Sequence, residues 1–206
     1  MPTITDITRQ RRAETRYSVY VDGRYAFALT DLELSTSGLR PGQELTSAEV
    51  ERYQKQEGET KAYMAAIRYL GTRPHSKREI RDFLQRKNYT DAAVDAALER
   101  LGQLRLIDDE QFAAAWIADR QALRPRSRRR LASELASKGV SREDIQVQLE
   151  GLGEEAELQS ALMVVRKKRR LPQYADPEKL FGYLMRQGYS PEISQRALHE
   201  ATNDVS

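Results

Sequence analysis

The sequence of 206 residues contains no cysteine and only two histidines. The lack of cysteine excludes disulfides, thiolate nucleophiles and cysteine-based zinc sites. His75 and His199 lie far apart in the sequence, and neither is near a pair of Asp, Glu or His residues at ligand spacing. We therefore predict that His75 is a solvated loop residue and His199 a solvated helix residue, with no metal site and no cofactor.

Long apolar runs are also missing. No stretch approaches the roughly 18 consecutive apolar residues of a membrane span, and residues 1–16 lack the apolar core of a signal peptide. These absences predict a soluble, cytoplasmic protein that does not contact a membrane. Glycine-rich phosphate loops, nucleophile elbows and paired histidine ligands are absent as well, so we expect no catalytic activity.

Positive charge is present but unevenly distributed. The formal net charge is only +3, yet the basic residues form two clusters, and such local fields favour a polyanion or an acidic protein surface. The second cluster falls near the expected end of a helix, where cations are stabilising, so a structural role explains it better. The first cluster comprises Arg124, Arg126, Arg128, Arg129 and Arg130, and the second comprises Arg166, Lys167, Lys168, Arg169 and Arg170.

The first thirty residues predict a small sheet. Residues 17–21 alternate apolar and polar side chains, Asp22 and Gly23 form a tight-turn signal, and the alternation resumes at Tyr25. Residues 4–10 could add a third strand. A hairpin by itself is marginally stable in water, so we expect it to pack on the next part of the chain.

A helix is expected to follow this sheet. Residues 46–49 resemble a capping box that begins a polar helix ending near Gln56, and Gly58 is the expected hinge into the remainder. The N-terminal region is therefore assigned to residues 1–58.

The remainder of the sequence is helical and repetitive. Residues 76–98 align with residues 127–149 at a constant offset of 51. Residues 178–198 align in turn with the second of these stretches, at an offset of 49. Caps, prolines and glycines divide each of three units into three helices. The predicted fold is therefore mainly α, with three tandem three-helix repeats, similar to helix-turn-helix modules, after the small N-terminal hairpin or sheet and its helix. The repeats are assigned to residues 59–107, 108–152 and 153–206.

Residues 106–140 contain most of the unusual features. The acidic residues 108–110 are explained better as a helix cap than as a metal site. Phe112, Trp116 and Leu123 share one helical face with Ala113 and Ile117, which predicts a core stripe. A partly exposed Trp116 at a partner surface is the alternative.

The arginines at 124–130 flank the start of a helix. The positive end of the helix dipole repels them there, so they do little for local stability. Backbone amides at that end favour anions, and guanidinium groups suit phosphates and carboxylates. This placement suggests a role outside the fold, although a merely solvated charged face is the alternative.

Three short helices per unit also describe a DNA-binding helix-turn-helix module. The third helix of each unit would read bases, but residues 92–104 and 142–153 have few Arg, Asn or Gln residues near their starts. The basic residues lie on and before the second helix instead, which disfavours sequence-specific reading of duplex DNA.

The sequence closely resembles the RecX family of regulators of the recombinase RecA. The resemblance rests on YLGTRPHSKREIRDFLQRK at 69–87, LIDDEQFAAAWIADR at 106–120 and RPRSRRRLASELASKGV at 124–140, in that order and spacing. It covers residues 60–200 well and the N-terminal region more loosely. One departure is Ser127, where glycine is expected in many relatives.

The resemblance implies an elongated, curved array of repeats that binds in the helical groove of the RecA filament on single-stranded DNA. It also implies inhibition of strand exchange, ATP hydrolysis and co-protease activity, and hence roles in homologous recombination, DNA repair and the SOS response. The expected partner is the RecA filament, with weak or indirect contact to single-stranded DNA, and the protein is expected to be a monomer without a cofactor.

We assign the predicted interaction site to one basic edge that recurs at equivalent places in the first two repeats. The edge would face acidic groups of the recombinase, DNA phosphates, or both. A helix-turn-helix regulator acting on duplex DNA and a passive adaptor for another acidic partner are the alternative functions. The predicted edge comprises Arg73, Lys77, Arg78, Arg81, Arg124, Arg126, Arg128, Arg129 and Arg130.

Overall fold

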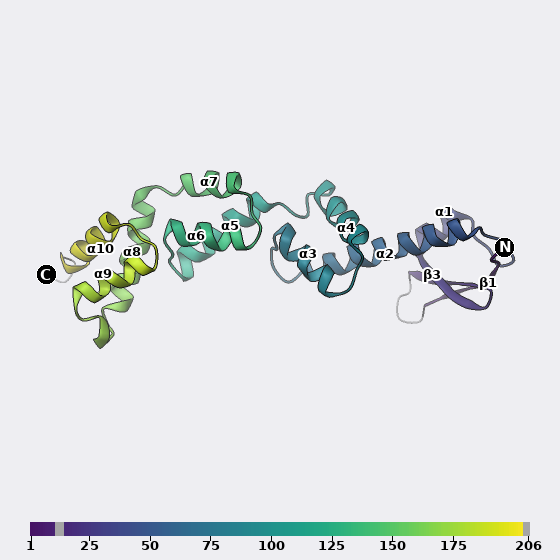
Figure 1. Cartoon of the computed structure of the whole chain (residues 1–206), viewed down its shortest axis with the longest axis horizontal. Helices are drawn as coiled ribbons and strands as arrows, with labels where there is room; N and C mark the ends of the chain where they lie inside the picture. Colours follow the sequence, from purple (N-terminus) through teal and green to yellow (C-terminus); the bar gives the residue numbers. More distant parts are fainter. Residues whose placement is uncertain (11–14, 204–206) are drawn as a thin grey trace. The chain divides into compact units, whose positions relative to one another are not determined.

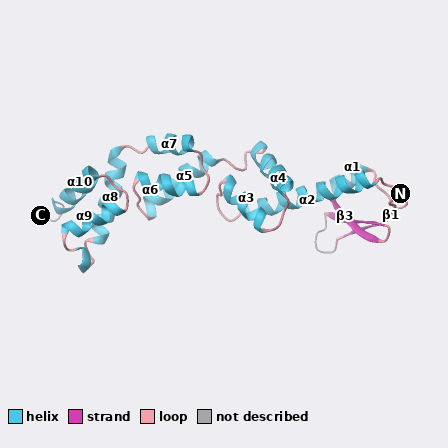
Figure 2. Ribbon diagram, viewed as in Figure 1, coloured by secondary structure: helices cyan, strands magenta, loops and turns pink. Residues whose placement is uncertain are grey.

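The computed structural model describes residues 1–10 and 15–203. Most of the chain is helical, with one small sheet near the N-terminus (Figures 1 and 2). The contacts divide the chain into two compact units. The first contains Met1–Arg73 with Ile80–Leu106, and the second contains Pro74–Glu79 with Ile107–Ser206.

The N-terminal sheet contains three antiparallel strands in the order β1-β2-β3. They are β1 (Ile4–Arg9), β2 (Arg16–Val21) and β3 (Arg24–Thr30). Asp22 and Gly23 both have positive φ, at 50° and 74°, as the two central residues of a type I′ hairpin turn require. The predicted hairpin and its third strand are therefore confirmed.

Two helices follow the sheet, and the second differs from the prediction. Helix α1 spans Asp31–Ser37, and α2 spans Ser47–Leu70 with the predicted capping box of Thr46 and Glu49. The predicted helix end near Gln56 and the hinge at Gly58 are both wrong, because α2 passes through these residues without a break. A glycine costs a helix only about 1 kcal/mol relative to alanine.

Contacts on both sides of Gly58 hold the helix against its neighbours. The ring of Tyr53 on α2 stacks on Phe27 of the sheet, with 4.8 Å between ring centroids. Next to the glycine, the buried carboxylate of Glu57 accepts a 2.6 Å hydrogen bond from the hydroxyl of Tyr25 and lies 2.6 Å from Nζ of Lys61. The N-terminal half of α2 thus supports the sheet, while its other half belongs to the first set of three helices.

The predicted sets of three helices are present in the described part of the chain. In the first set, α2 packs against α4, and the rings of Tyr69 and Phe83 stack 4.1 Å apart. Besides α2, the first set contains α3 (Lys77–Arg86) and α4 (Asp91–Gln103); the second contains α5 (Asp109–Leu123), α6 (Arg128–Ser137) and α7 (Arg142–Glu150); the third contains α8 (Glu154–Lys168), a short η1 (Pro172–Tyr174), α9 (Pro177–Arg186) and α10 (Pro191–Asn203).

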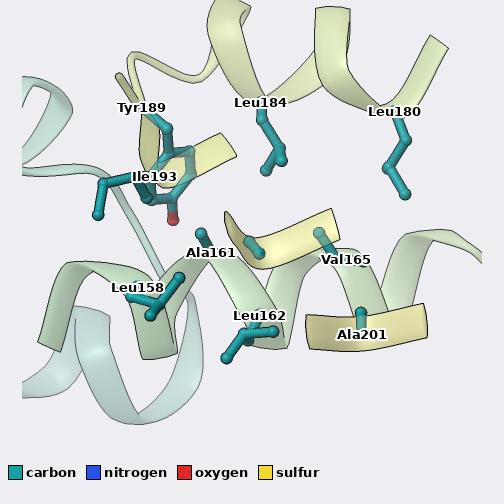
Figure 3. Packing of buried hydrophobic residues seen from close by; sticks show 10 residues of the cluster. Leu158, Ala161, Leu162, Val165, Leu180, Leu184, Tyr189, Ile193 and Ala201 are labelled. Atoms are coloured by element: carbon teal, nitrogen blue, oxygen red, sulfur yellow. The ribbon is translucent and has the colours of Figure 1, made fainter. Parts of the chain in front are cut away.

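Each of the last two sets has its own apolar core. In the third set, Leu162 and Val165 of α8 belong to the same buried cluster as Leu184 of α9, and α10 contributes residues that include Ile193 (Figure 3). The second set repeats this arrangement, and the residues that share its core are Phe112, Ala113, Ile117, Leu131, Leu135, Val140, Ile145, Leu149 and Leu152.

The structure corrects part of the predicted stripe on α5. Phe112, Ala113 and Ile117 are buried, but Leu123 is 71% exposed because it is the last residue of α5, beyond the packed core. Trp116 is partly buried at the edge of this core.

The prediction for His75 is wrong, whereas His199 is exposed as expected. His75 is 4% exposed, and its Nδ1 lies 3.3 Å from a carboxylate oxygen of Glu79 one helical turn later. In the part of the chain that the structure describes, no helix is long and apolar enough to span a bilayer. The described residues also contain no group of three potential metal ligands of the His, Cys, Asp or Glu type.

Candidate interaction surface

A single carboxylate, that of Glu134 on α6, holds several of the basic residues near the predicted edge. Its Oε2 accepts a hydrogen bond of 3.0 Å from Nε1 of Trp116 and another of 3.0 Å from Nε of Arg120. Nε of Arg126 lies 3.4 Å and Nε of Arg130 lies 3.9 Å from its other oxygen. Three guanidinium groups from two helices and the segment between them therefore surround one acid.

The environment of Glu134 keeps it ionised. Burial by itself would raise the pKa of this carboxyl, but the hydrogen bonds from Arg120 and Trp116 and the charges of Arg120 and Arg126 outweigh it and lower the pKa. The ring of Trp116 is also covered by cations, with Cζ of Arg120 3.9 Å and Nζ of Lys138 4.2 Å from its centroid. Trp116 therefore has a structural role between α5 and α6.

The arginines of the first basic cluster separate into two groups. Arg126 and Arg130 lie near Glu134, and the buried Nε of Arg126 has no hydrogen-bond partner within the described residues. Arg124 and Arg129 are exposed and Arg128 is half-buried, and none of these three side chains forms an ion pair with a described residue. Helix α6 also has no acidic residue in its first turn. These three guanidinium groups are available to a partner.

The earlier part of the predicted edge is distributed over both units. Arg81 of the first unit forms a 2.7 Å ion pair with Asp95, so its charge is already partnered. Lys77 and Arg78 are exposed and belong to the second unit, whereas Arg73 is exposed and belongs to the first.

The second basic cluster serves the fold. Arg166, Lys167 and Lys168 lie in the last turn of α8, where their charges complement the helix dipole. Nζ of Lys168 lies 5.0 Å from the ring centroid of Tyr183, and the Arg169 guanidinium donates to the carbonyl of Ala201 at the end of α10. Lys167 and Arg170 are exposed.

Within the second unit, a buried serine connects two helices at each of two equivalent places. Ser76 Oγ accepts from the amide of Glu79, capping α3, and donates a 2.6 Å hydrogen bond to the carbonyl of Lys138 at the end of α6. Ser127, 51 residues later, caps α6 and donates a 2.7 Å bond to the carbonyl of Gln187 at the end of α9. We call these places the first and the second junction.

One further contact recurs at both junctions. The amide of Lys77 donates to a carboxylate oxygen of Asp109 at 2.9 Å, and the equivalent amide of Arg128 donates to Glu157 at 3.0 Å. Burial raises the pKa of Asp109 in spite of this hydrogen bond.

A left-handed glycine follows each accepting carbonyl. Gly139 has φ +81°, and a Cβ there would lie 2.6 Å from Cβ of Arg78; Gly188 has φ +89°, and its Cβ would lie 2.8 Å from Oγ of Ser127. The repeats therefore share one mode of contact as well as one fold.

Several residues of this surface were not predicted, although some of them carry a signal in the sequence. Trp116 and Arg120 are four residues apart on α5, and so are Arg130 and Glu134 on α6, the spacing at which helical side chains meet. The contact between Ser127 and Gln187 has no comparable signal, because it joins residues that lie sixty positions apart.

Comparisons with known proteins agree with the repeat structure. Three family models match: the RecX N-terminal domain at residues 2–46, the first RecX three-helix domain at 62–101 and the second at 108–147. The regulatory protein RecX of Listeria monocytogenes serotype 4a is 28% identical over 206 residues, covering 98% of this chain and 77% of the relative. That of Bacillus licheniformis is 29% identical over 204 residues, covering 97% and 78%.

Two solved structures share the fold. A crystal structure of regulatory protein RecX has a TM-score of 0.75 at 24% identity and covers 95% of this chain and 98% of the other. RecX from Lactobacillus salivarius has a TM-score of 0.63 at 17% identity and covers 71% and 98%. With three domain matches in the order that the sequence predicts, the chain belongs to the RecX family of regulatory proteins.

Proposed function

We propose that this protein is a non-enzymatic regulator of the recombinase RecA in the cytoplasm. It binds as a monomer in the groove of the RecA filament on single-stranded DNA and inhibits strand exchange, ATP hydrolysis and co-protease activity. Family membership supports a regulatory role. Contact with single-stranded DNA is weak or indirect in this proposal.

The observation that carries the proposal is the group of unpartnered arginines at the start of α6. Arg128 and Arg129 occupy the first turn of that helix, where the dipole repels positive charge, and neither forms an ion pair with a described residue. Arginines that weaken their own helix and lack internal partners are explained by an external anionic surface. The basic cluster at 166–170, in contrast, has internal contacts that explain it.

Repetition explains how modest contacts would suffice. Tandem repeats present equivalent surfaces at regular spacing, so several weak contacts to successive filament subunits combine through effective concentration. An array of repeats lying in the groove would exclude a second DNA without any chemistry by this chain. The division into an N-terminal region at 1–58 and repeats at 59–107, 108–152 and 153–206 is part of this proposal.

The test is charge reversal in a strand-exchange and ATPase assay with recombinase-coated DNA. We expect the triple variant R128E/R129E/R130E to abolish inhibition while its helical circular dichroism is unchanged. The control K87E/R142E/K179E removes the same charge from exposed positions outside the predicted edge and should inhibit normally. Since Arg130 lies near Glu134, the double variant R128E/R129E, which leaves that contact intact, is the second probe.

Unchanged inhibition by both edge variants would refute the assignment of the surface. Tight, sequence-selective binding of the natural chain to naked duplex DNA would favour the helix-turn-helix alternative instead. The reading helix α7 carries Glu143 and Asp144 in its first turn, and these two carboxylates disfavour an approach to DNA phosphates. If phosphates dominate the filament contact, its affinity will fall steeply with salt.

A further inference from the structure

A pocket of about 580 Å³ lies at the second junction, between α6 and the end of α9. Its lining includes Arg129, Arg130, Ser133 and Ser137 of α6 together with Met185 and Arg186 of α9. The pocket lies entirely within the second unit. Three guanidinium groups, two hydroxyl groups and one exposed methionine side chain thus line one concave site.

Positive charge in this pocket exceeds the negative charge available to it. Glu134 is the carboxylate of the lining, and Arg120 and Trp116 already hold its Oε2 at 3.0 Å. Arg129 and Arg186 are exposed and form no ion pair with a described residue, and Arg130 lies 3.9 Å from Glu134 while its side chain is 46% exposed. The pocket can therefore accept a further anionic group.

The first junction shows what is missing at the second. There, Glu79 occupies the position equivalent to Arg130, and Lys138 occupies the position equivalent to Gln187. A carboxylate oxygen of Glu79 lies 2.6 Å from Nζ of Lys138, so the first junction contains its own acidic residue, which forms an ion pair within the junction. At the second junction both partners of this ion pair are replaced, so the carboxylate of Glu79 has no equivalent there, and the carboxylate of the lining, that of Glu134, is held by Arg120 and Trp116.

We propose that the pocket at the second junction binds a glutamate or aspartate side chain from an acidic segment of a partner protein. The incoming carboxylate would lie among Arg129, Arg130 and Arg186, in the role that Glu79 has at the first junction. Guanidinium groups form paired hydrogen bonds with carboxylates, and the exposed side chain of Met185 would contact an apolar neighbour in the same segment.

Single-stranded DNA fits this pocket less well than a peptide. Sites for single strands combine a basic groove with aromatic side chains on which bases stack, whereas the lining contains no aromatic residue. The nearby ring of Trp116 is already in contact with Arg120 and Lys138. Glu134 in the wall would repel a run of phosphates, but it leaves room for one carboxylate between flanking guanidinium groups.

This inference rests on the proposed function only in taking the partner to be a protein, and it is tested without the recombinase. The probe is a fluorescein-labelled peptide of alternating Glu and Leu, and binding to the full-length chain is measured by fluorescence anisotropy against fluorescein-labelled oligo(dT). We expect R129Q/R186Q to weaken peptide binding at least about tenfold, the effect of losing one charge-assisted contact. The control R142Q/K179Q removes two exposed charges outside the pocket and should change the affinity less than about twofold.

A second variant tests the comparison of the two junctions. R130E/Q187K transfers the ion pair of the first junction to the second and should close the pocket, so that the peptide no longer binds although the chain remains folded. Equal losses in R129Q/R186Q and R142Q/K179Q would overturn the proposal in favour of unspecific charge attraction. Oligo(dT) binding that is tighter than peptide binding and is lost in the same pocket variant would overturn it in favour of nucleic acid. Failure of charge reversal to relieve recombinase inhibition would affect the proposed function alone.

Discussion

The hydroxyl of Ser76 donates a hydrogen bond of 2.6 Å to the backbone carbonyl oxygen of Lys138, 62 residues further along the chain. The same oxygen atom of Ser76 caps α3 by accepting from the amide of Glu79. One buried hydroxyl therefore satisfies a free amide at the start of one helix and a free carbonyl at the end of another. Ser127 does the same between α6 and Gln187.

Removing either serine hydroxyl should cost more than the loss of an ordinary cap. Ser76→Ala and Ser127→Ala each remove a cap and leave a carbonyl without its donor, so we expect about 2 kcal/mol of destabilisation in urea unfolding. Ser141→Ala is the control, because Ser141 is exposed and caps only α7, and it should cost about 1 kcal/mol. Equal losses in all three variants would show that the carbonyl bonds contribute nothing.

Substitution of a junction glycine should destabilise the fold strongly, for two reasons. Gly139→Ala introduces a Cβ at φ +81° and 2.6 Å from Cβ of Arg78, so both backbone strain and a steric clash oppose it. Gly42→Ala is the matched control, since Gly42 has φ +83° but open space around it, and strain alone should cost about 1–2 kcal/mol. We expect Gly139→Ala to lower the unfolding free energy by at least about 1 kcal/mol more than the control. The same loss in both variants would mean that Arg78 moves aside freely.

The continuity of α2 can be tested at Gly58. A Cβ at this position meets nothing within 4 Å, and the residue lies inside a helix. Gly58→Ala should therefore raise the free energy of unfolding by about 0.5–1 kcal/mol, the difference in helix propensity. A decrease measured by thermal or urea unfolding would indicate that the chain needs a hinge at this glycine after all.

The Glu134 network predicts a pH dependence with a definite sign. Because the pKa of Glu134 is lower in the folded chain than in the unfolded chain, its ionised form stabilises the fold above the ordinary glutamate value of about 4.3, and this contribution is lost as the pH falls through the folded value. Glu134→Gln should cost about 1–2 kcal/mol at pH 7.

The difference from the natural chain should shrink as the pH drops below about 4. Urea titrations of both chains across this range measure it. Glu143→Gln is the control, since Glu143 is exposed and forms no ion pair with a described residue, and it should show little difference at either pH. A gap between Glu134→Gln and the natural chain that stays constant with pH would contradict the role of Glu134 as an ionised partner of Arg120.

The repeat pattern was predictable because it depends on local rules. Leu84 and Leu135 fall at the same point of their helices, and capping residues such as Ser141 mark helix starts, so periodicity and caps located the helices of the three sets. The hinge predicted at Gly58 was wrong, because the helix-breaking tendency of one glycine was weaker than the packing of Tyr53 and Glu57 against the sheet. His75 was placed wrongly for a similar reason, since burial depends on neighbours in space that a sequence does not reveal.

The sequence by itself determined the fold class, the family and the position of the basic residues along the chain, because composition, helical period and motif order are all visible in the order of the residues without any knowledge of their contacts in space. Only the tertiary structure decided which of those charges are available. It neutralised Arg81 with Asp95, gathered Arg120 and Arg126 around Glu134, and left Arg129 without a described partner. Charge is a property of a residue, but availability depends on the distance to the nearest opposite charge, and folding sets that distance.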